Sequence, residues 1–139
     1  MLLFEKLLEK DIEKIVDWFP DFSVEQIKTF LSEEQNIAFV ARLDGEIIGL
    51  IYGYSLTRME DASPQFFIYS VDIHDAHQNK GYGQRFIKFV LDWAKENGYC
   101  ECFVLTNKDN PAACRAYEKA GMEHSETDCE RMYVAEFMR

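Results

Sequence analysis

No stretch of this chain approaches the roughly 20 consecutive apolar residues that a membrane-spanning helix requires. The first residues, Met1-Leu2-Leu3-Phe4-Glu5-Lys6, also lack the basic and then apolar layout of a signal peptide, because charged residues return at once. We therefore expect a cytoplasmic protein with no membrane partner. The chain has 139 residues, of which 47% are hydrophobic, and this length and apolar content predict a single domain, residues 1–139.

Basic residues are scarce relative to acidic ones. The chain has 15 Lys and Arg against 25 Asp and Glu, a formal net charge of −10. A nucleic-acid surface needs a basic stripe that neutralises phosphates, so we expect no nucleic-acid partner. An acidic cleft concentrates positive ligands, so the charge is compatible with a cationic small molecule, although solubility alone would explain it equally well.

Patterns that bind metals are also missing. The four cysteines have no C-x-x-C spacing, and we expect them to be reduced, mostly buried small residues. Residues 72–77 include two His and two Asp, but successive side chains of a strand and turn point apart, whereas a metal needs converging ligands. We expect no metal site. The cysteines are Cys100, Cys102, Cys114 and Cys129.

Hydrophobic spacing divides the chain into strands that alternate with helices. Helices are expected over residues 9–19, 24–31, 82–97 and 110–120, and strands over residues 1–7, 36–43, 46–56, 66–73 and 100–105. Asp44-Gly45 is a two-residue hairpin turn, and the polar stretch 57–65 is a loop. In the tail, residues 122–138, we expect two more strands around a turn near Thr127-Asp128. This order predicts an α/β fold with a mixed sheet.

One turn combines the features of an anion site. Gln78-Asn79-Lys80-Gly81-Tyr82-Gly83 follows the strand 66–73 and opens an amphipathic helix. Glycine lets the backbone approach a ligand, and the first N–H groups of a helix lack partners and carry the positive end of its dipole. The third glycine of the dinucleotide fingerprint is absent, because Phe86 stands there, and no Gly-Lys-Ser/Thr string indicates a Walker loop. We therefore predict a different phosphate site, in an enzyme that uses a phosphate-bearing cofactor.

A second segment makes the assignment more specific. Asn110-Pro111-Ala112-Ala113-Cys114-Arg115-Ala116-Tyr117-Glu118-Lys119-Ala120-Gly121-Met122 follows the short strand 100–105. Together the two segments resemble the GNAT family of acetyl-CoA-dependent N-acetyltransferases, strongly over residues 66–122 and loosely elsewhere. Within that family, the run 66–71 with its turn looks most like the aminoglycoside 3-N-acetyltransferase branch. The resemblance implies a mixed six- or seven-stranded sheet, flanked by about four helices and splayed open where the cofactor sits.

The resemblance also implies which residues hold acetyl-CoA, the expected co-substrate. In the family, N–H groups of the turn hold the pyrophosphate, and the strand before the turn donates backbone hydrogen bonds to the pantetheine arm. Ile73 is the matching strand position, and Val71 lies near the thioester. Asn110 caps the second helix and reaches the arm, and Ala113 is small where this helix packs near the cofactor. The matching turn residues are Gln78, Asn79, Lys80, Gly81, Tyr82, Gly83 and Gln84.

Two residues are candidates for proton transfer. Tyr117 occupies the position of the family's acid, since a phenol at the sulfur can protonate the leaving thiolate; alternatively it shares a helix face with Ala113 and only packs. The incoming amine is an ammonium ion and must lose a proton before it attacks. Asp72 is our first candidate for the base, unless it is merely a strand-end carboxylate. His74, Glu60 and a water chain are the alternatives.

The expected function is acetyl transfer from acetyl-CoA to a primary amine. Its acceptor is expected to be a small cation, such as an aminoglycoside or polyamine. A protein N-terminus or lysine is the alternative acceptor, and a non-catalytic acyl-CoA-binding sensor is the alternative outside the enzymes. The acceptor loops, residues 22–34 and 57–65, carry no signature, and either a monomer or a homodimer fits the sequence.

Overall fold

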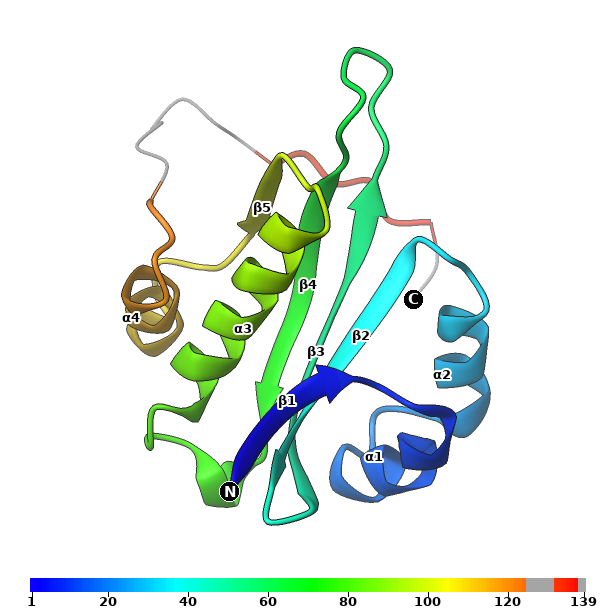
Figure 1. The fold of residues 1–139 in the computed structure, drawn as a ribbon, viewed down its shortest axis with the longest axis vertical. Coiled ribbons are helices and arrows are strands. Elements are labelled where there is room, and N and C mark those ends of the chain that lie inside the picture. Colours follow the sequence, from blue (N-terminus) through cyan, green and yellow to red (C-terminus); the bar gives the residue numbers. More distant parts are fainter. Residues whose placement is uncertain (125–131, 138–139) are drawn as a thin grey trace.

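A computed structural model describes residues 1–124 and 132–137, and at its centre lies a mixed five-stranded sheet in the order β1-β2-β3-β4-β5 (Figure 1). Strands β1 to β4 pair antiparallel, whereas β4 and β5 run parallel. The strands are β1 (Leu2–Lys6), β2 (Asn36–Leu43), β3 (Glu46–Leu56), β4 (Gln65–Ile73) and β5 (Glu101–Val104). The helices are α1 (Ile12–Trp18), α2 (Val24–Leu31), α3 (Tyr82–Glu96) and α4 (Pro111–Lys119), with two short 3-10 helices, η1 (Glu9–Asp11) and η2 (Asp75–His77).

The predicted α/β class and mixed sheet are confirmed, but the number of strands is smaller than expected. The sheet has five strands rather than six or seven, because residues 122–124 and 132–137 form no strand. The large apolar side chains of the latter segment, including Tyr133 and Phe137, are exposed, so no buried face supports a strand there. The turn predicted at Thr127-Asp128 lies outside the described residues.

The helix predicted over residues 9–19 is interrupted at Asp11. The buried carboxylate of Asp11 accepts a hydrogen bond from the Leu8 N–H at 3.1 Å. It also forms an ion pair with Arg42, whose Nη2 donates a hydrogen bond to it at 2.6 Å. Because Asp11 is held by these partners, the chain forms the 3-10 helix η1 before α1 begins at Ile12.

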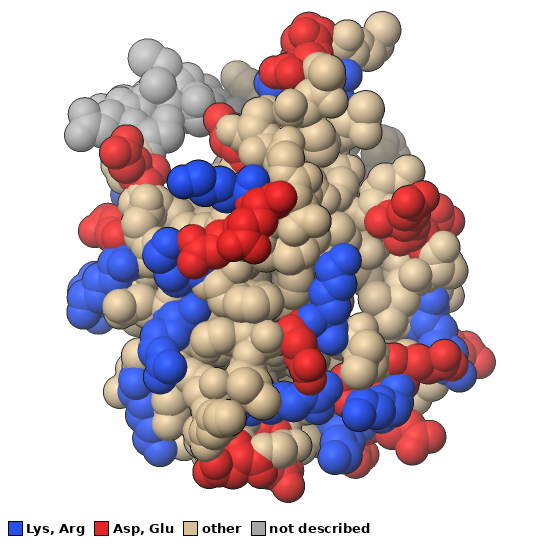
Figure 2. Space-filling view, in the orientation of Figure 1, with Lys and Arg blue, Asp and Glu red and all other residues tan. Residues whose placement is uncertain are grey.

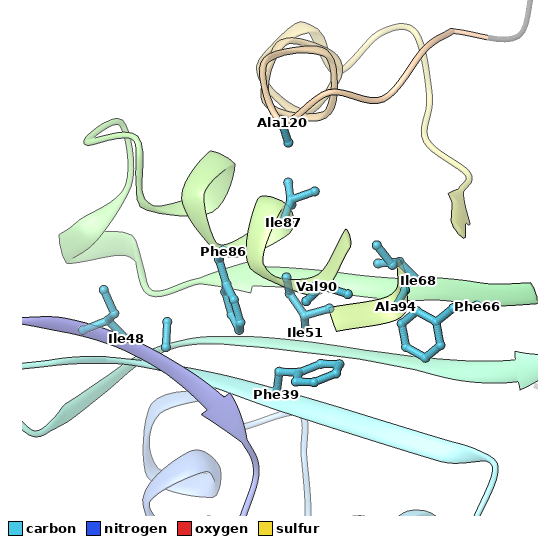
Figure 3. Close-up of a cluster of buried hydrophobic side chains, with 11 residues drawn as sticks. Phe39, Ile48, Ile51, Phe66, Ile68, Phe86, Ile87, Val90, Ala94 and Ala120 are labelled. Carbon is cyan, nitrogen blue, oxygen red and sulfur yellow. The ribbon is translucent and has the colours of Figure 1, made fainter. Parts of the chain in front are cut away.

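Two hydrophobic cores, one on each face of the sheet, produce a three-layer arrangement. On one face, Phe39 and Ile51 pack against α3, and α4 adds Ala120 behind Ile87 (Figure 3). On the other face, Val40 belongs to the cluster beneath α1 and α2. Neighbouring residues of β2 thus face opposite cores, as a strand period of two requires.

A bulge in β4 determines which side chains face which layer. Tyr52 pairs with Ser70 and the next residue of β3 pairs with Ile68, so Tyr69 is an extra residue. Ile68 and Val71 both pack on the α3 side, although strict alternation would place them on opposite faces. The bulge therefore directs Val71 and Ile73 toward α3 and shifts the facing of every later residue of the strand.

The sheet also opens beyond this bulge. The parallel pairing of β5 with β4 ends where Val104 meets Ile68, so residues 69–73 of β4 have no strand partner on that side within the described chain. The pairing of β4 with β5 therefore ends in the middle of the sheet, before Val71 and Ile73, and the expected splay stays a prediction.

We expect Gly53→Ala to destabilise the protein by about 3 kcal/mol or more, because strands β3 and β4 approach closely beside the bulge. A Cβ atom at Gly53 would lie 2.1 Å from the carbonyl oxygen of Phe67. Gly45→Ala is the control, since Gly45 has φ +88° but nothing within 4 Å of an added Cβ, and it should lose only about 1 kcal/mol. Urea denaturation measures both, and an equal loss would contradict the close approach.

Candidate functional site

The glycine turn has the backbone geometry of an anion site. Gly81 caps α3 in the left-handed conformation, with φ 80° and ψ 4°, and no side chain caps the helix. The helical hydrogen bonds begin with the Arg85 N–H donating to the Gly81 carbonyl at 3.2 Å. The first turn of α3 carries no acidic residue. Its leading N–H groups are therefore directed at the space before the helix, where they attract an anion.

A cavity of about 440 Å³ lies in front of this turn, between β4 and α4. The structure brings together almost all of the predicted cofactor-binding residues at this cavity, and Lys80 is the exception. Those that line it are Val71, Ile73, Gln78, Asn79, Gly81, Tyr82, Gly83, Gln84, Asn110, Ala113 and Tyr117. Residues that our sequence reasoning missed are His77, Ile87, Ala112, Arg115, Ala116 and Lys119. We call this space the turn cavity.

The two glycines of the turn leave room that the protein itself does not fill. A Cβ atom at Gly81 would have nothing within 4 Å, and one at Gly83 would meet only Ile73 Cγ1 at 3.6 Å. The positive φ accounts for glycine at position 81, but Gly83 has no such φ. The absence of a side chain at Gly83 is therefore best explained by a ligand that approaches the backbone closely.

The turn cavity is positive in a chain whose net charge is −10. Arg115 and Lys119 line it, and its described lining includes no Asp or Glu. Basic side chains also gather along the edge of the molecule that carries α3 and α4 (Figure 2). Both cations could have been found from the sequence, because they are spaced i, i+4 on a helix that already carried candidate residues. An anionic ligand is favoured here.

Helix α4 presents Tyr117 to the same cavity. The helix is capped by Asn110, whose Oδ1 accepts a hydrogen bond from the Ala113 N–H at 3.2 Å, and Pro111 follows the cap. Burial raises the pKa of the Tyr117 hydroxyl, and the nearby Cys114 and Asp72 raise it further. The phenol is therefore protonated at neutral pH, as a proton donor must be.

Asp72 faces the opposite side of the sheet, as the bulge requires. Its Oδ2 accepts a hydrogen bond from Ser70 Oγ at 2.8 Å. Both residues line a second cavity, of about 400 Å³, beneath the end of α1. Asp21 and Asp75 line it too, so we call it the acidic cavity. A cation is favoured in this cavity, whereas an anion is favoured in the turn cavity.

The two cavities meet at the end of β4. Ile73 and Gln78 line both of them. The side-chain amide of Gln78 donates to the Ile73 carbonyl at 3.0 Å and to Asp75 Oδ1 at 3.2 Å, which holds the junction together. The turn cavity and the acidic cavity are therefore separated only by this end of β4 and by Gln78.

His74 and Glu60, the alternative candidates for the general base, lie in different parts of the structure. His74 lines the acidic cavity, where its Nδ1 accepts a hydrogen bond from the Ala76 N–H at 3.3 Å and its ring packs against Trp18. Glu60 lies in the loop between β3 and β4, 4.0 Å from Arg58 Nη1, and it is not among the residues that line either cavity.

The prediction that the cysteines are mostly buried is wrong, whereas the described cysteines are free thiols as expected. Cys100 is exposed and Cys102 and Cys114 are half-buried, since their strand and helix lie at the edge of the fold, and none of the three is in a disulfide. Burial raises the pKa of Cys102 to about 12, and Glu101 adds to the rise, so this thiol is a poor nucleophile. Cys129 lies outside the described residues.

Among residues 1–124 and 132–137, no group of three or more His, Cys, Asp or Glu side chains converges in a way that would hold a metal ion. No helix among these residues is long and apolar enough to cross a membrane.

Comparisons with known proteins agree with this geometry. Residues 4–122 match the sequence model of the acetyltransferase (GNAT) family. Streptothricin acetyltransferase A of Bacillus subtilis is 29% identical over 97 residues, which cover 66% of this chain and 50% of that protein. The chain spans about half the length of the curated relatives it matches.

Solved structures share the fold over nearly the whole chain. An aminoglycoside acetyltransferase from an uncultured soil metagenomic sample, in complex with trehalose, has a TM-score of 0.81 at 24% identity, with 97% of each chain covered. A ribosomal-protein-alanine N-acetyltransferase from Brucella melitensis has a TM-score of 0.80 at 17% identity, with 99% of this chain and 100% of that chain covered.

Proposed function

Because the chain belongs to the acetyltransferase (GNAT) family, we propose that it transfers the acetyl group of acetyl-CoA to a primary amine. The observation that carries this proposal is the pair of cavities of opposite charge that meet at Ile73 and Gln78. The turn cavity suits the anionic coenzyme, and the acidic cavity suits an ammonium ion. The reaction requires these two ligands to meet.

The residues of the turn cavity fit coenzyme A. The N–H groups at the start of α3 hold the pyrophosphate, and the missing side chain at Gly83 allows its close approach. Arg115 and Lys119 supply positive charge for the remaining phosphate. Residues 69–73 of β4, which have no strand partner on the β5 side among residues 1–124 and 132–137, offer backbone groups to the pantetheine arm, near Val71 and Ile73.

Two side chains carry the proton transfers in this proposal. Asp72 accepts a proton from the ammonium ion, and the free amine then forms a bond to the acetyl carbon. Backbone N–H groups of β4 stabilise the charge that develops on the carbonyl oxygen. As the carbon–sulfur bond breaks, Tyr117 donates its proton to the sulfur, and the nitrogen's second proton passes to the resulting Tyr117 phenolate, directly or through water, so that free thiol and neutral amide are the products.

The acceptor is proposed to be a small amine that is cationic at neutral pH. Aminoglycosides and polyamines, which we expected from the sequence, belong to this class. Support comes from the three aspartates of the acidic cavity, from the similarity to streptothricin acetyltransferase A and from the fold shared with an aminoglycoside acetyltransferase.

Release of coenzyme A thiol from acetyl-CoA should accompany acetylation of a small amine, and its efficiency should fall as salt rises. Screening shortens the reach of the acidic cavity's field from about 10 Å at 0.1 M salt to about 3 Å at 1 M. The assay uses small mono- and polyamines, an aminoglycoside, and peptides with a free N-terminus or lysine.

The outcomes of this assay separate the three candidate functions. Acetylation of peptides alone would show that the small-molecule acceptor is wrong, while transfer to an amine would stand. If no amine releases thiol although calorimetry detects coenzyme A binding, the chain is a binding module and acetyl transfer is wrong.

A further inference from the structure

A third cavity, of about 350 Å³, lies between α2 and strands β2 and β3, and aromatic rings form much of its wall. The ring of Phe30 lies edge-on to Tyr52 at 5.2 Å and to Tyr54 at 5.6 Å between centroids. Phe22 lies edge-on to Tyr52 at 6.3 Å. We call this space the ring-lined cavity.

The ring-lined cavity is a neighbour of the acidic cavity. Phe22 lines both of them. Across the ladder between β3 and β4, Leu50 is the partner of Asp72, and Tyr52 is the partner of Ser70. Residues paired in this way have Cβ atoms only about 5 Å apart. One wall of the ring-lined cavity is therefore the immediate neighbour of the carboxylate to which we assigned the ammonium ion.

The lining of the ring-lined cavity is more apolar than polar. Its polar side chains are Gln26, Thr29, Asn36, the hydroxyl-bearing Tyr52 and Tyr54, and Glu33, the one charged lining residue in the described chain, which is exposed. A second ammonium group of a polyamine would find only Glu33 as a charged partner, and the hydroxyls of an amino sugar would lie against a mostly apolar wall. An apolar ring gains from burial and from edge-to-face contacts with the surrounding rings.

We propose that the acceptor is a primary amine attached to an apolar, ring-bearing body, with the amine at Asp72 and the ring in the ring-lined cavity. This inference rests on the acetyl transfer proposed above and selects one class among the small cationic amines. Phe22 forms the passage between the two parts of the ligand, and the length of a short alkyl chain separates the ring from the amine.

A panel of amines tests whether the protein prefers a ring-bearing amine to a polyamine or an amino sugar. In the thiol-release assay, 2-phenylethylamine should have a kcat/KM at least about tenfold above those of spermidine and kanamycin, since losing the ring's burial costs at least that factor. A higher kcat/KM for spermidine or kanamycin would overturn the inference while leaving acetyl transfer intact.

Two substitutions in α2 test whether the ring of the amine binds in the ring-lined cavity. Thr29 is an exposed residue that lines the ring-lined cavity, so Thr29→Trp should obstruct it and raise the KM for 2-phenylethylamine at least about tenfold. Lys28→Trp is the matched control, because Lys28 is exposed on the same helix and is not among the lining residues. It should leave that KM unchanged. Equal KM values in the wild type and Thr29→Trp would overturn the inference.

A binding measurement shows whether this inference fails or only the proposed acetyl transfer does. If no amine releases thiol, calorimetry with 2-phenylethylamine on the coenzyme A-saturated protein still decides the matter. Binding that Thr29→Trp abolishes and Lys28→Trp retains would support the ring-lined cavity although transfer had failed. Absence of binding to the wild type would overturn it.

Discussion

Gly81→Asp is expected to weaken acetyl-CoA binding about a thousandfold and to leave the protein folded. A carboxylate at this position would enter the space that is empty beside Gly81, at the start of α3, where we place the pyrophosphate. Two like charges about 4 Å apart repel by about 4 kcal/mol at an effective dielectric constant of 20, which is about a thousandfold in affinity. Isothermal titration calorimetry with acetyl-CoA measures the loss, and circular dichroism checks the fold.

Two variants separate the charge from the backbone strain. Asn tolerates the left-handed conformation about as well as Asp, so Gly81→Asn should bind acetyl-CoA more tightly than Gly81→Asp does. Gly98→Asp places the same side chain at a similar φ, +82°, beyond the far end of α3, and its affinity should equal that of the wild type. Unchanged affinity in a folded Gly81→Asp protein would remove the coenzyme from the turn cavity.

Tyr117→Phe is expected to lower turnover about 10²- to 10⁴-fold while acetyl-CoA affinity changes little, because the proton matters only as charge builds on sulfur. Burial, with Cys114 and Asp72, raises the pKa of the hydroxyl above its usual value. The acid form therefore persists to at least about pH 10, and this residue should cause no loss of wild-type rate below that pH. The pH profile of thiol release tests both statements.

Tyr99→Phe is the control for this change, because the Tyr99 hydroxyl bonds to Ser55 and is not among the residues that line the three cavities. Its turnover should remain near that of the wild type. A Tyr117→Phe protein with wild-type turnover would make Tyr117 a packing residue. In the same assay, Asp72→Asn should also be slow between about pH 6 and 9, and an unchanged rate would assign deprotonation to water or another residue.

Local signals in the sequence were sufficient to predict most of the individual helices and strands. Each of α2, α3 and α4 begins within one residue of its predicted start, because caps and apolar spacing act within a few turns of one helix. Asn110 caps α4 as predicted, and Asp44 and Gly45 both have the positive φ of a two-residue hairpin. The strand-to-helix geometry of the glycine turn could likewise be predicted, since it depends on neighbouring backbone alone, and anion binding there stays a prediction.

Local signals in the sequence did not predict the structure of the tail or the burial of the cysteines correctly. Residues 132–137 have the apolar content of a strand, but a strand also needs a neighbouring edge and a face to bury, and neither is a property of the segment itself. The exposure of Cys100 likewise depends on tertiary structure, because Cys100 directly precedes β5, which lies at the edge of the sheet.

The sequence by itself determined the layered α/β class, the glycine turn at the start of α3 and the helix that carries Tyr117, because each depends on short-range spacing. The tertiary structure alone decided how these parts face one another. The extra residue at Tyr69 turns Val71 toward α3 and Asp72 toward the acidic cavity, and α4 brings Arg115 beside the turn. Register and packing between distant segments set these positions, since a one-residue shift exchanges the two faces of a strand.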